Sequence, residues 1–338
     1  MVRVRDQSHL SAGGNIDLEQ WLQKLPCSFS EIEASRLLRA CAMAQDALHA
    51  PGVDSGDWAV ESNCFSAGLE IALILAELRV GSDCLLAGIL YRAVREQRLS
   101  REQVAQEFGA AVARMIDGVA RMAAISELRP RDDRPVLGQA QAQKDNIRKM
   151  LVALVDDVRV ALIKLAERTC AIRAVKNDEQ RRLVVAREVF DVYAPLAHRL
   201  GIGHLKWELE DLSFRYAYSD AYRKIARLLD GKRVERDQFI NRVKSELTAA
   251  LRNAGLEVEI DGRSKHIYSI WRKMQRKGIG FSQVYDIRAI RILVQDVRDC
   301  YATLGLVHGL WRNIPHEFDD YIANPKENGY RSLHTAVV

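Results

Sequence analysis

The chain of 338 residues lacks the features of disulfide scaffolds, secreted precursors and membrane spans. Its six cysteines are scattered and form no C-x-x-C pair, which favours reduced thiols in a cytosolic protein over a disulfide framework or a zinc site. The most hydrophobic run, residues 71–78, is interrupted by Glu77 and is far shorter than the roughly 18 apolar residues of a membrane span. No apolar segment follows the charged N-terminal residues, so no secretory signal is visible. We therefore expect a cytoplasmic protein that does not contact membranes.

Glycine-rich phosphate loops are also missing. Gly231-Lys232 is preceded by Ala226 where a P-loop needs its first glycine, and the Gly-Ile-Gly steps at 201–203 and 278–280 lack the third glycine of a dinucleotide fingerprint. If the protein binds phosphate, side chains rather than a glycine-rich cradle must hold it.

What is present is an ordinary globular composition, 48% hydrophobic and 28% charged, with a length that predicts two or three domains. The net charge of +5 is unevenly distributed. Residues 263–291 contain eight Lys or Arg and one acid, giving +7, so the remainder carries −2. A local positive field of this size suits a nucleotide phosphate chain or a nucleic acid. A solvated basic helix face is the plainer alternative.

The hydrophobic pattern changes along the chain. Up to about residue 225 it is that of amphipathic helices, which are predicted over 30–48, 65–79, 83–98, 100–125, 147–158, 178–193 and 203–216, with a loop over 128–138. After about residue 254, strands are predicted over 256–260 and 287–294 and helices over 264–277 and 297–312, followed by a turn-rich segment and a third strand opening at 335–338. We expect an all-helical domain followed by an incomplete α+β domain.

The predicted helix 264–277 has a basic face and an apolar face. The basic face consists of Lys265, Ser269, Arg272 and Arg276, and the opposite side consists of Ile267, Ile270, Trp271 and Met274. Arg263 precedes the helix, where backbone N–H groups also attract anions. The face is suited to phosphate, although ordinary surface helices commonly have the same pattern.

The next predicted strand contains a lone acid among cations. Asp286 and Arg288 share one face of this strand, and Arg291 points to the other. Asp286 is equally suited to binding Mg²⁺ and to pairing with a neighbouring arginine. Tyr330, after the Asn328-Gly329 turn, could stack on a base or simply pack.

Three ordered stretches, residues 262–274, 285–291 and 321–335, closely resemble the (p)ppGpp synthetase domain of the RelA/SpoT family. Residues 193–202 and 206–211 resemble that family's interdomain helices. The resemblance implies a multidomain α and α+β fold. It places an all-helical HD-type pseudo-hydrolase domain over 1–200 and connecting helices over 201–250. A nucleotidyltransferase-like α+β synthetase domain with a mixed sheet would follow over 251–338, incomplete at its C-terminus.

Members of this family transfer the β,γ-pyrophosphate of ATP to the ribose 3′-hydroxyl of GDP or GTP, with Mg²⁺ as cofactor. The resemblance implies catalytic roles for Asp286, Arg291 and His334, with Asp286 holding Mg²⁺. The residues implied for ATP are Arg263, Lys265, Ser269 and Lys273, and those implied for the guanine nucleotide are Lys326, Asn328 and Tyr330, with Tyr330 stacking on guanine.

The chain departs from the family pattern at two places. Arg331 stands where the family usually has Gln. The family's catalytic Glu, in a Glu-x-Gln-Ile-Arg stretch, is expected just past residue 338, so these residues alone are expected to make little or no (p)ppGpp.

An acidic stretch, Glu317, Asp319 and Asp320, resembles the E-x-D-D signature of monofunctional RelA-type synthetases, which tend to prefer GDP. Taken without the resemblance, these three residues would be interpreted as a solvated acidic loop.

The helical domain resembles the family's hydrolase, which uses Mn²⁺ held by His and Asp. None of the eight histidines lies between residues 50 and 197, and the expected metal-site and catalytic positions are occupied by Ala67, Tyr91, Arg92, Glu167 and Ala171. Without imidazole or a carboxylate cluster, no Mn²⁺ site is expected. The resemblance therefore implies a degenerate hydrolase domain kept for folding and regulation.

Two other functions are weighed against pyrophosphate transfer. One is a non-catalytic regulatory or interaction module that retains nucleotide binding. The other is direct RNA binding, which is weaker because the sequence has no RRM, KH or OB signature. Family resemblance assigns contacts with the ribosome and uncharged tRNA to C-terminal domains outside these residues.

Overall fold

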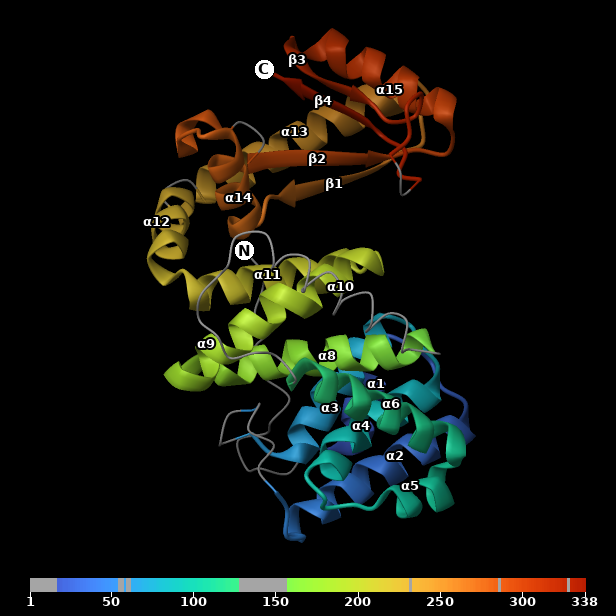
Figure 1. Ribbon diagram of the computed structural model, residues 1–338. Coiled ribbons are helices and arrows are strands. Elements are labelled where there is room, and N and C mark those ends of the chain that lie inside the picture. The colour runs from blue at the N-terminus through green and yellow to red at the C-terminus, as the bar shows by residue number, and fades with distance from the viewer. Residues whose placement is uncertain are drawn as a thin grey trace. The chain divides into compact units, whose positions relative to one another are not determined.

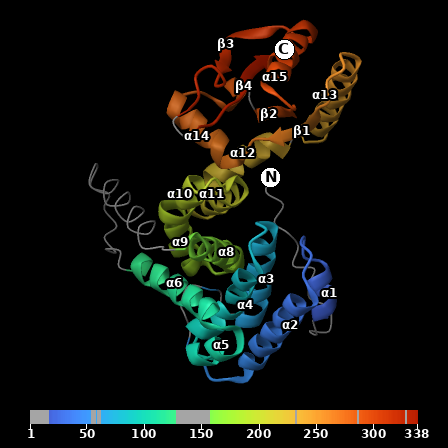
Figure 2. The same ribbon diagram turned by 90° about the vertical axis from the view of Figure 1, so that its right-hand side faces the viewer.

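The computed structural model describes residues 17–53, 58, 62–127, 157–230, 233–284, 287–326 and 329–338. The chain divides into two compact units, Val2–Ser219 and Asp220–Val338, whose elements are shown in Figures 1 and 2. The loop predicted over 128–138 and nearly all of the helix predicted over 147–158 lie outside the described residues. The domain limits predicted at residues 200 and 250 stay a prediction. No described helix is long and apolar enough to cross a membrane.

The described part of the first unit is helical. Its α-helices are α1 (Leu18–Gln23), α2 (Glu31–Asp46), α3 (Cys64–Glu77), α4 (Ser82–Arg95), α5 (Arg101–Phe108), α6 (Ala110–Glu127), α8 (Val158–Ala174), α9 (Glu179–Glu188), α10 (Ala194–Arg199) and α11 (Gly203–Ala217). Short 3₁₀ turns at Ala47–His49 and Val175–Asn177 extend α2 and α8. Most of the predicted helices are confirmed, with two corrections at their boundaries.

The single helix predicted over 100–125 is wrong, because Gly109 divides it into α5 and α6. Gly109 has φ 96° and ψ 159°, a combination that is open essentially only to glycine and that cannot continue a helix. Ser100 begins α5 with a capping box, in which its hydroxyl accepts from the Gln103 N–H and the Gln103 side chain accepts from the Ser100 N–H. The hydrophobic periodicity continues across the break, which is why the pattern alone does not show it.

The helix predicted over 178–193 is not regular to its end. After α9, one π-helical turn, Val189–Tyr193, leads into α10. Pro195, the second residue of α10, has no N–H to donate to a carbonyl one turn earlier, so the regular α-helical ladder cannot pass through it. The wider turn before Pro195 accommodates this missing bond.

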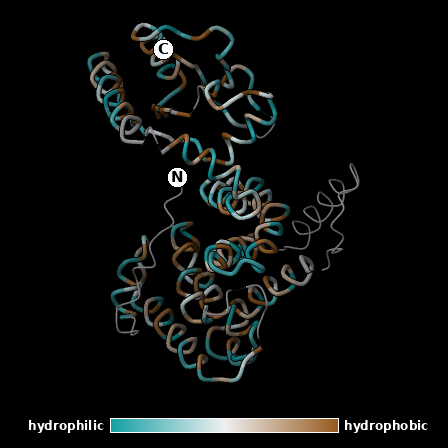
Figure 3. Tube along the Cα trace, turned by 90° about the vertical axis from the view of Figure 1, so that its left-hand side faces the viewer, coloured by the Kyte–Doolittle hydropathy of each residue, from teal (hydrophilic) through white to brown (hydrophobic). Residues whose placement is uncertain are grey.

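The core of the first unit is centred on α3, α4 and α8. Every position from 84 to 93 in α4 is buried. Figure 3 shows hydrophobic positions recurring along the helices of the first unit. In α8 the buried positions include three charged residues, Lys164, Glu167 and Arg168, which must find partners inside the unit.

The second unit combines helices with two strand pairs. Its elements are α12 (Ser219–Asp230), α13 (Arg233–Asn253), β1 (Glu259–Ser264), α14 (Ile267–Lys277), β2 (Arg288–Leu293), α15 (Val297–Leu310), β3 (Asn313–Asp320) and β4 (Leu333–Val337). Helix α13 packs against β1, β2 and α15 (Figure 1). At Gly262 in β1, an added Cβ would lie 2.5 Å from Cγ2 of Ile240 on α13, so only glycine allows this close approach.

The strand predicted over 256–260 starts three residues later, at Glu259. Leu256 instead closes the turn that follows α13, because its N–H donates to the carbonyl of Leu251 near the end of that helix. The helix predicted from 264 begins at Ile267, since Ser264 pairs with Arg288 in the antiparallel β1–β2 ladder. The strand predicted over 287–294 is confirmed as β2, and the helix over 297–312 as α15.

Strand β3 was expected to be a turn-rich segment. It pairs with β4 in antiparallel register, with Asp319 opposite His334, and an irregularity between Asn313 and Phe318 includes His316 at φ 67°. Both pairings among the described strands are antiparallel, so these strands do not form the mixed sheet that was expected. The described strands form two separate two-stranded sheets, β1–β2 and β3–β4, so none of them has a parallel neighbour.

Candidate nucleotide site and buried charge cluster

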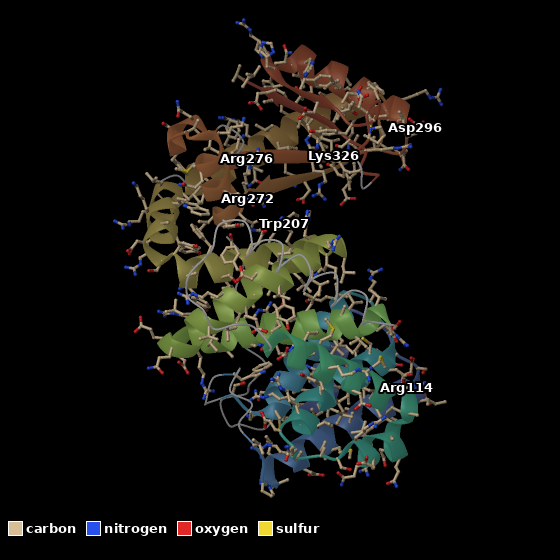
Figure 4. The ribbon with its side chains drawn as sticks, viewed as in Figure 1. Arg114, Trp207, Arg272, Arg276, Asp296 and Lys326 are labelled. Carbon is tan, nitrogen blue, oxygen red and sulfur yellow. The ribbon has the colours of Figure 1, made fainter. Side chains whose placement is uncertain are left out.

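The basic face predicted on α14 points away from the core. Ile267 and Ile270 are buried, whereas Arg272 and Arg276, labelled in Figure 4, are exposed. Ser269 and Lys273 are half-buried and lie four residues apart, on one side of the helix. The structure therefore confirms the prediction in part: Ile267 and Ile270 face inward and the two arginines outward, whereas Trp271 and Met274 are half-buried and Lys265 precedes the helix.

The other residues predicted for ATP lie where β1 leads into α14. Lys265 is half-buried, and its backbone N–H donates to the carbonyl of Ile287 at 3.3 Å. The backbone of Arg263 pairs with Ala289, and its side chain is outside the described residues. Arg291 is exposed on β2, directly opposite Asp261. Asp286, predicted to hold Mg²⁺, is outside the described residues, as is Asn328.

A cluster of three aromatic rings and a lysine follows β3. We call Tyr321, Lys326, Tyr330 and His334 the loop cluster. The Lys326 ammonium lies 4.1 Å from the ring centre of Tyr321 and 5.6 Å from that of Tyr330, within cation–π range. His334 forms a 3.0 Å hydrogen bond between Nε2 and the Tyr330 hydroxyl, and its ring meets that of Tyr321 edge-on at 5.2 Å.

The loop cluster brings together three of the residues predicted for the guanine site and its chemistry: Lys326, Tyr330 and His334. Lys326 is labelled in Figure 4. Tyr330 is 44% exposed, so part of the aromatic surface is open to a ligand. Sequence reasoning missed Tyr321 as a member of the cluster. The sequence did offer a signal, because Tyr321 opens the stretch 321–335 that also contains the other three residues of the cluster.

The acidic stretch on β3 does not act as one unit. Glu317 and Asp319 are exposed, and neither side-chain carboxylate has a hydrogen-bond partner among the described residues. Asp320 accepts hydrogen bonds from the backbone N–H groups of Ile322 and Ala323, at 2.9 and 2.8 Å, and from the Tyr301 hydroxyl at 2.9 Å. The N–H of Ala323, together with these other donors, holds the pKa of Asp320 below its ordinary value.

In the first unit, the buried charges of α8 surround Glu167. We call Trp58, Lys164, Glu167 and Arg168 the charge cluster. Glu167 Oε2 accepts from Arg168 Nε at 2.7 Å and lies 2.9 Å from Lys164 Nζ. Glu167 Oε1 accepts from Trp58 Nε1 at 3.0 Å and from a second nitrogen of Arg168. Both carboxylate oxygens are therefore occupied by donors of the protein itself.

The charge cluster shifts the protonation of its own members. Burial alone would raise the pKa of Glu167, but the charges of Arg168 and Lys164 outweigh it and hold the pKa well below its ordinary range. Burial, with Arg168 nearby, lowers the pKa of Lys164 to about 8. The carboxylate of Glu167 thus stays ionised and paired inside the unit.

Arg92, at the second position of the expected His-Asp pair, is tied to structure. Its guanidinium donates to Glu96 Oε1 at 2.6 Å and to the Ser62 hydroxyl at 2.7 Å, and it lies 4.4 Å from the ring centre of Trp58. Tyr91 is buried, and burial raises the pKa of its hydroxyl. Ala67 and Ala171 are buried in the same unit and offer no ligand atoms in their side chains.

Among the described residues, no group of three or more His, Cys, Asp or Glu side chains could hold a metal ion. The chemistry of the described donor set agrees with this, since the charges gathered at Glu167 are mostly positive.

Comparison with known proteins adds two matches along the chain. Residues 40–203 match the model of the HD domain, and residues 262–338 match that of a region found in RelA / SpoT proteins. The helical first unit and the α+β second unit thus define a protein in which an HD domain precedes a RelA/SpoT region.

The chain is also similar to curated relatives named GTP pyrophosphokinase. The chain is 41% identical to a GTP pyrophosphokinase of Escherichia coli over 340 residues, which is 100% of this chain and 44% of the relative. It is 42% identical to a GTP pyrophosphokinase of Haemophilus influenzae over the same shares, and 46% identical to one of Photobacterium angustum over 80% of this chain and 36% of the relative. The chain spans less than half the length of these relatives. It belongs to the RelA/SpoT family.

Proposed function

We propose that the protein acts in (p)ppGpp synthesis, transferring the β,γ-pyrophosphate of ATP to the 3′-hydroxyl of GDP or GTP. In this reaction the ribose 3′-oxygen bonds to the β-phosphorus, the bond from that phosphorus to the α,β-bridging oxygen breaks, and AMP leaves. The observation that supports the proposal most is the loop cluster, which joins Lys326, Tyr330 and His334 into one partly exposed aromatic surface. A purine base can stack on such a surface while the lysine faces the phosphates.

The ATP side of the proposal rests on α14 and the preceding turn. Lys265, Ser269 and Lys273 would bind the phosphates of ATP, and Arg263 would contact its adenine. Arg291 would neutralise charge that develops on the transferred group. Phosphoryl-type transfer depends on such positioning and charge neutralisation more than on covalent catalysis.

Magnesium would be held by Asp286, with phosphate oxygens and water completing its shell. One carboxylate with several phosphate oxygens is an ordinary donor set for Mg²⁺. When bound, the ion would polarise the transferred phosphoryl group. The 338 residues contain no Glu-x-Gln-Ile-Arg stretch, so we propose that by themselves they make little product.

The acidic stretch supports a preference for GDP over GTP by family resemblance. Within it, Glu317 and Asp319 are the residues with exposed carboxylates, so they are the ones that we propose to influence nucleotide choice.

Substitutions at Tyr330 test the synthetase proposal. In Tyr330→Ala, the dissociation constant for mant-GDP is expected to rise about five- to a hundredfold, because base–aromatic stacking contributes about 1–3 kcal/mol. Tyr330→Phe is the matched control, since it keeps the ring and removes the hydroxyl that is bonded to His334, and it should bind within about threefold of the unaltered chain. The reaction itself is assayed in the natural chain with ATP and GDP. Equal binding by Tyr330→Ala and the unaltered chain would contradict the role of Tyr330.

We also propose that the HD domain is a pseudo-hydrolase. The supporting observation is that Glu167, at a position where the family's hydrolases have Asp, has both oxygens occupied by Trp58, Lys164 and Arg168. Four donor nitrogens surround its two oxygens, which matches the number of lone pairs that a carboxylate offers. Mn²⁺-dependent release of pyrophosphate from (p)ppGpp by this protein would refute the proposal.

A further inference from the structure

Asp320 connects the loop cluster to helix α15. Its Oδ1 accepts hydrogen bonds from the N–H groups of Ile322 and Ala323, two residues in the first turn of the loop after β3. Its Oδ2 accepts a 2.9 Å hydrogen bond from the hydroxyl of Tyr301, which lies in the first half of α15. The carboxylate is thus fixed between a helix that does not belong to the loop and the backbone from which the loop begins.

The turn that Asp320 holds contains one wall of the loop cluster. Tyr321 lies between Asp320 and the two bonded N–H groups, and its own N–H donates to the Ser332 carbonyl at 3.0 Å. The ring of Tyr321 contacts both Lys326 and His334. A shift of this turn therefore moves the surface against which Lys326, Tyr330 and His334 are arranged.

Helix α15 is also tied to the strand on the far side of the loop. His308 Nε2 and the Thr335 hydroxyl are 2.9 Å apart, and Thr335 pairs with Phe318 across the β3–β4 ladder. The same helix therefore contacts both strands that flank the loop. Its Tyr301 bonds to Asp320 at the end of β3, and its His308 lies beside Thr335 in β4.

We propose that Tyr301 is a positioning residue for the guanine-nucleotide site, acting through Asp320 on the turn that begins the loop cluster. The inference rests on the proposed function of that cluster. It also divides the acidic stretch: Asp320 orders the loop, and only Glu317 and Asp319 are left to face solvent or ligand.

The test removes one hydroxyl at a time from α15. Tyr301→Phe deletes the donor to Asp320 and keeps the ring, which is 41% exposed. Thr303→Val is the matched control, because it deletes a hydroxyl two residues away that is buried and has no hydrogen-bond partner among the described residues. The dissociation constants of mant-GDP and of a fluorescent ATP analogue are measured for each variant in the natural chain. Hydrogen exchange is followed at the amides of Ile322 and Ala323.

Tyr301→Phe is expected to weaken mant-GDP binding about three- to tenfold, as the loss of one hydrogen bond predicts, with ATP binding unchanged. Exchange at the two amides should become faster in this variant alone. Thr303→Val should match the unaltered chain in all three measurements. A positioning role weakens binding of the guanine nucleotide and leaves ATP binding unchanged, whereas a general structural role would weaken both.

Two results would overturn the inference. One is unchanged mant-GDP binding in Tyr301→Phe, and the other is an equal weakening of both nucleotides with faster exchange throughout the second unit. Failure of the proposed function itself looks different, because the unaltered chain would then not bind mant-GDP, and the positioning role would fall with it.

Discussion

Two carboxylates of this protein, Glu167 and Asp320, each accept hydrogen bonds from three residues, yet they do different work. Glu167 is fully buried, so its partners are needed to keep a charge in the interior, and breaking such a pair costs about 3–5 kcal/mol. Asp320 is half-buried, and it mainly orders the turn whose backbone N–H groups donate hydrogen bonds to it. Burial therefore decides whether a hydrogen-bonded carboxylate governs stability or the geometry of a site.

A pH titration of stability tests the charge cluster at Lys164. The folded pKa is about 8, and the unfolded side chain loses its proton near its ordinary value of about 10.4. Between these two pH values the unfolded chain binds more protons at Lys164 than the folded chain does, so the free energy of unfolding rises with pH. The physical reason is that a neutral lysine no longer incurs the penalty of burying a charge. The free energy of unfolding of the unaltered chain, minus that of Lys164→Met, should increase by on the order of 3 kcal/mol from pH 8 to pH 10.5.

The control for this titration is Lys176→Met, which replaces an exposed lysine of the same unit. Urea unfolding of the three chains at each pH gives the two difference curves. A flat curve for Lys164→Met, or the same rise for both variants, would show that Lys164 is not the titrating group.

At the scale of elements, sequence patterns located most helices and missed the features set by the backbone. Gly109 interrupts a continuous hydrophobic periodicity by its φ and ψ alone, so the pattern predicted one helix where there are two. Strand β3 contains Pro315 and three acids, a composition typical of loops, and its pairing with β4 is visible only in three dimensions. Within the site, the Tyr301–Asp320 bond spans 19 residues and carries no local signal.

Gly109 also allows a prediction on the α5–α6 break. Gly109→Ala should lower the free energy of unfolding by about 1–3 kcal/mol, because alanine is strained at φ 96° and ψ 159°. Gly81→Ala is the control: Gly81 is the N-cap of α4 at φ −62° with no atom within 4 Å of an added Cβ. The weaker capping by alanine and its smaller loss of backbone entropy on folding act in opposite directions, so the net effect should stay below about 1 kcal/mol. Calorimetry compares the two variants. Equal effects would mean that the backbone conformation at Gly109 is not required.

At the scale of the whole molecule, an HD domain and a RelA/SpoT region share one chain, and we propose that only the second retains chemistry. The aligned motifs identified the family and the three residues gathered at the loop cluster. Sequence could not show that Lys164, Arg168 and Trp58 all converge on Glu167, because residues 58 and 167 are brought together only by folding.

Binding of Mn²⁺ can be measured without any activity. A metal present at a hundred times its dissociation constant adds about 2.7 kcal/mol to stability, which would raise the melting temperature by roughly 5–10 °C. For this protein, without nucleotide, we expect no rise attributable to the HD domain when Mn²⁺ is added. A shift of several degrees that disappears on adding a chelator would contradict the pseudo-hydrolase proposal.

The arrangement at Glu167 has an evolutionary consequence. Restoring a metal ligand by one substitution, such as Arg92→Asp or Glu167→Asp, would leave Lys164 and Arg168 still competing with the metal for the carboxylate. Removing either cation first would take donors away from the buried Glu167 carboxylate, which is costly by itself. Under the pseudo-hydrolase proposal, a metal site at Glu167 would therefore require several buried residues to change together, so we expect strong epistasis among Lys164, Glu167 and Arg168.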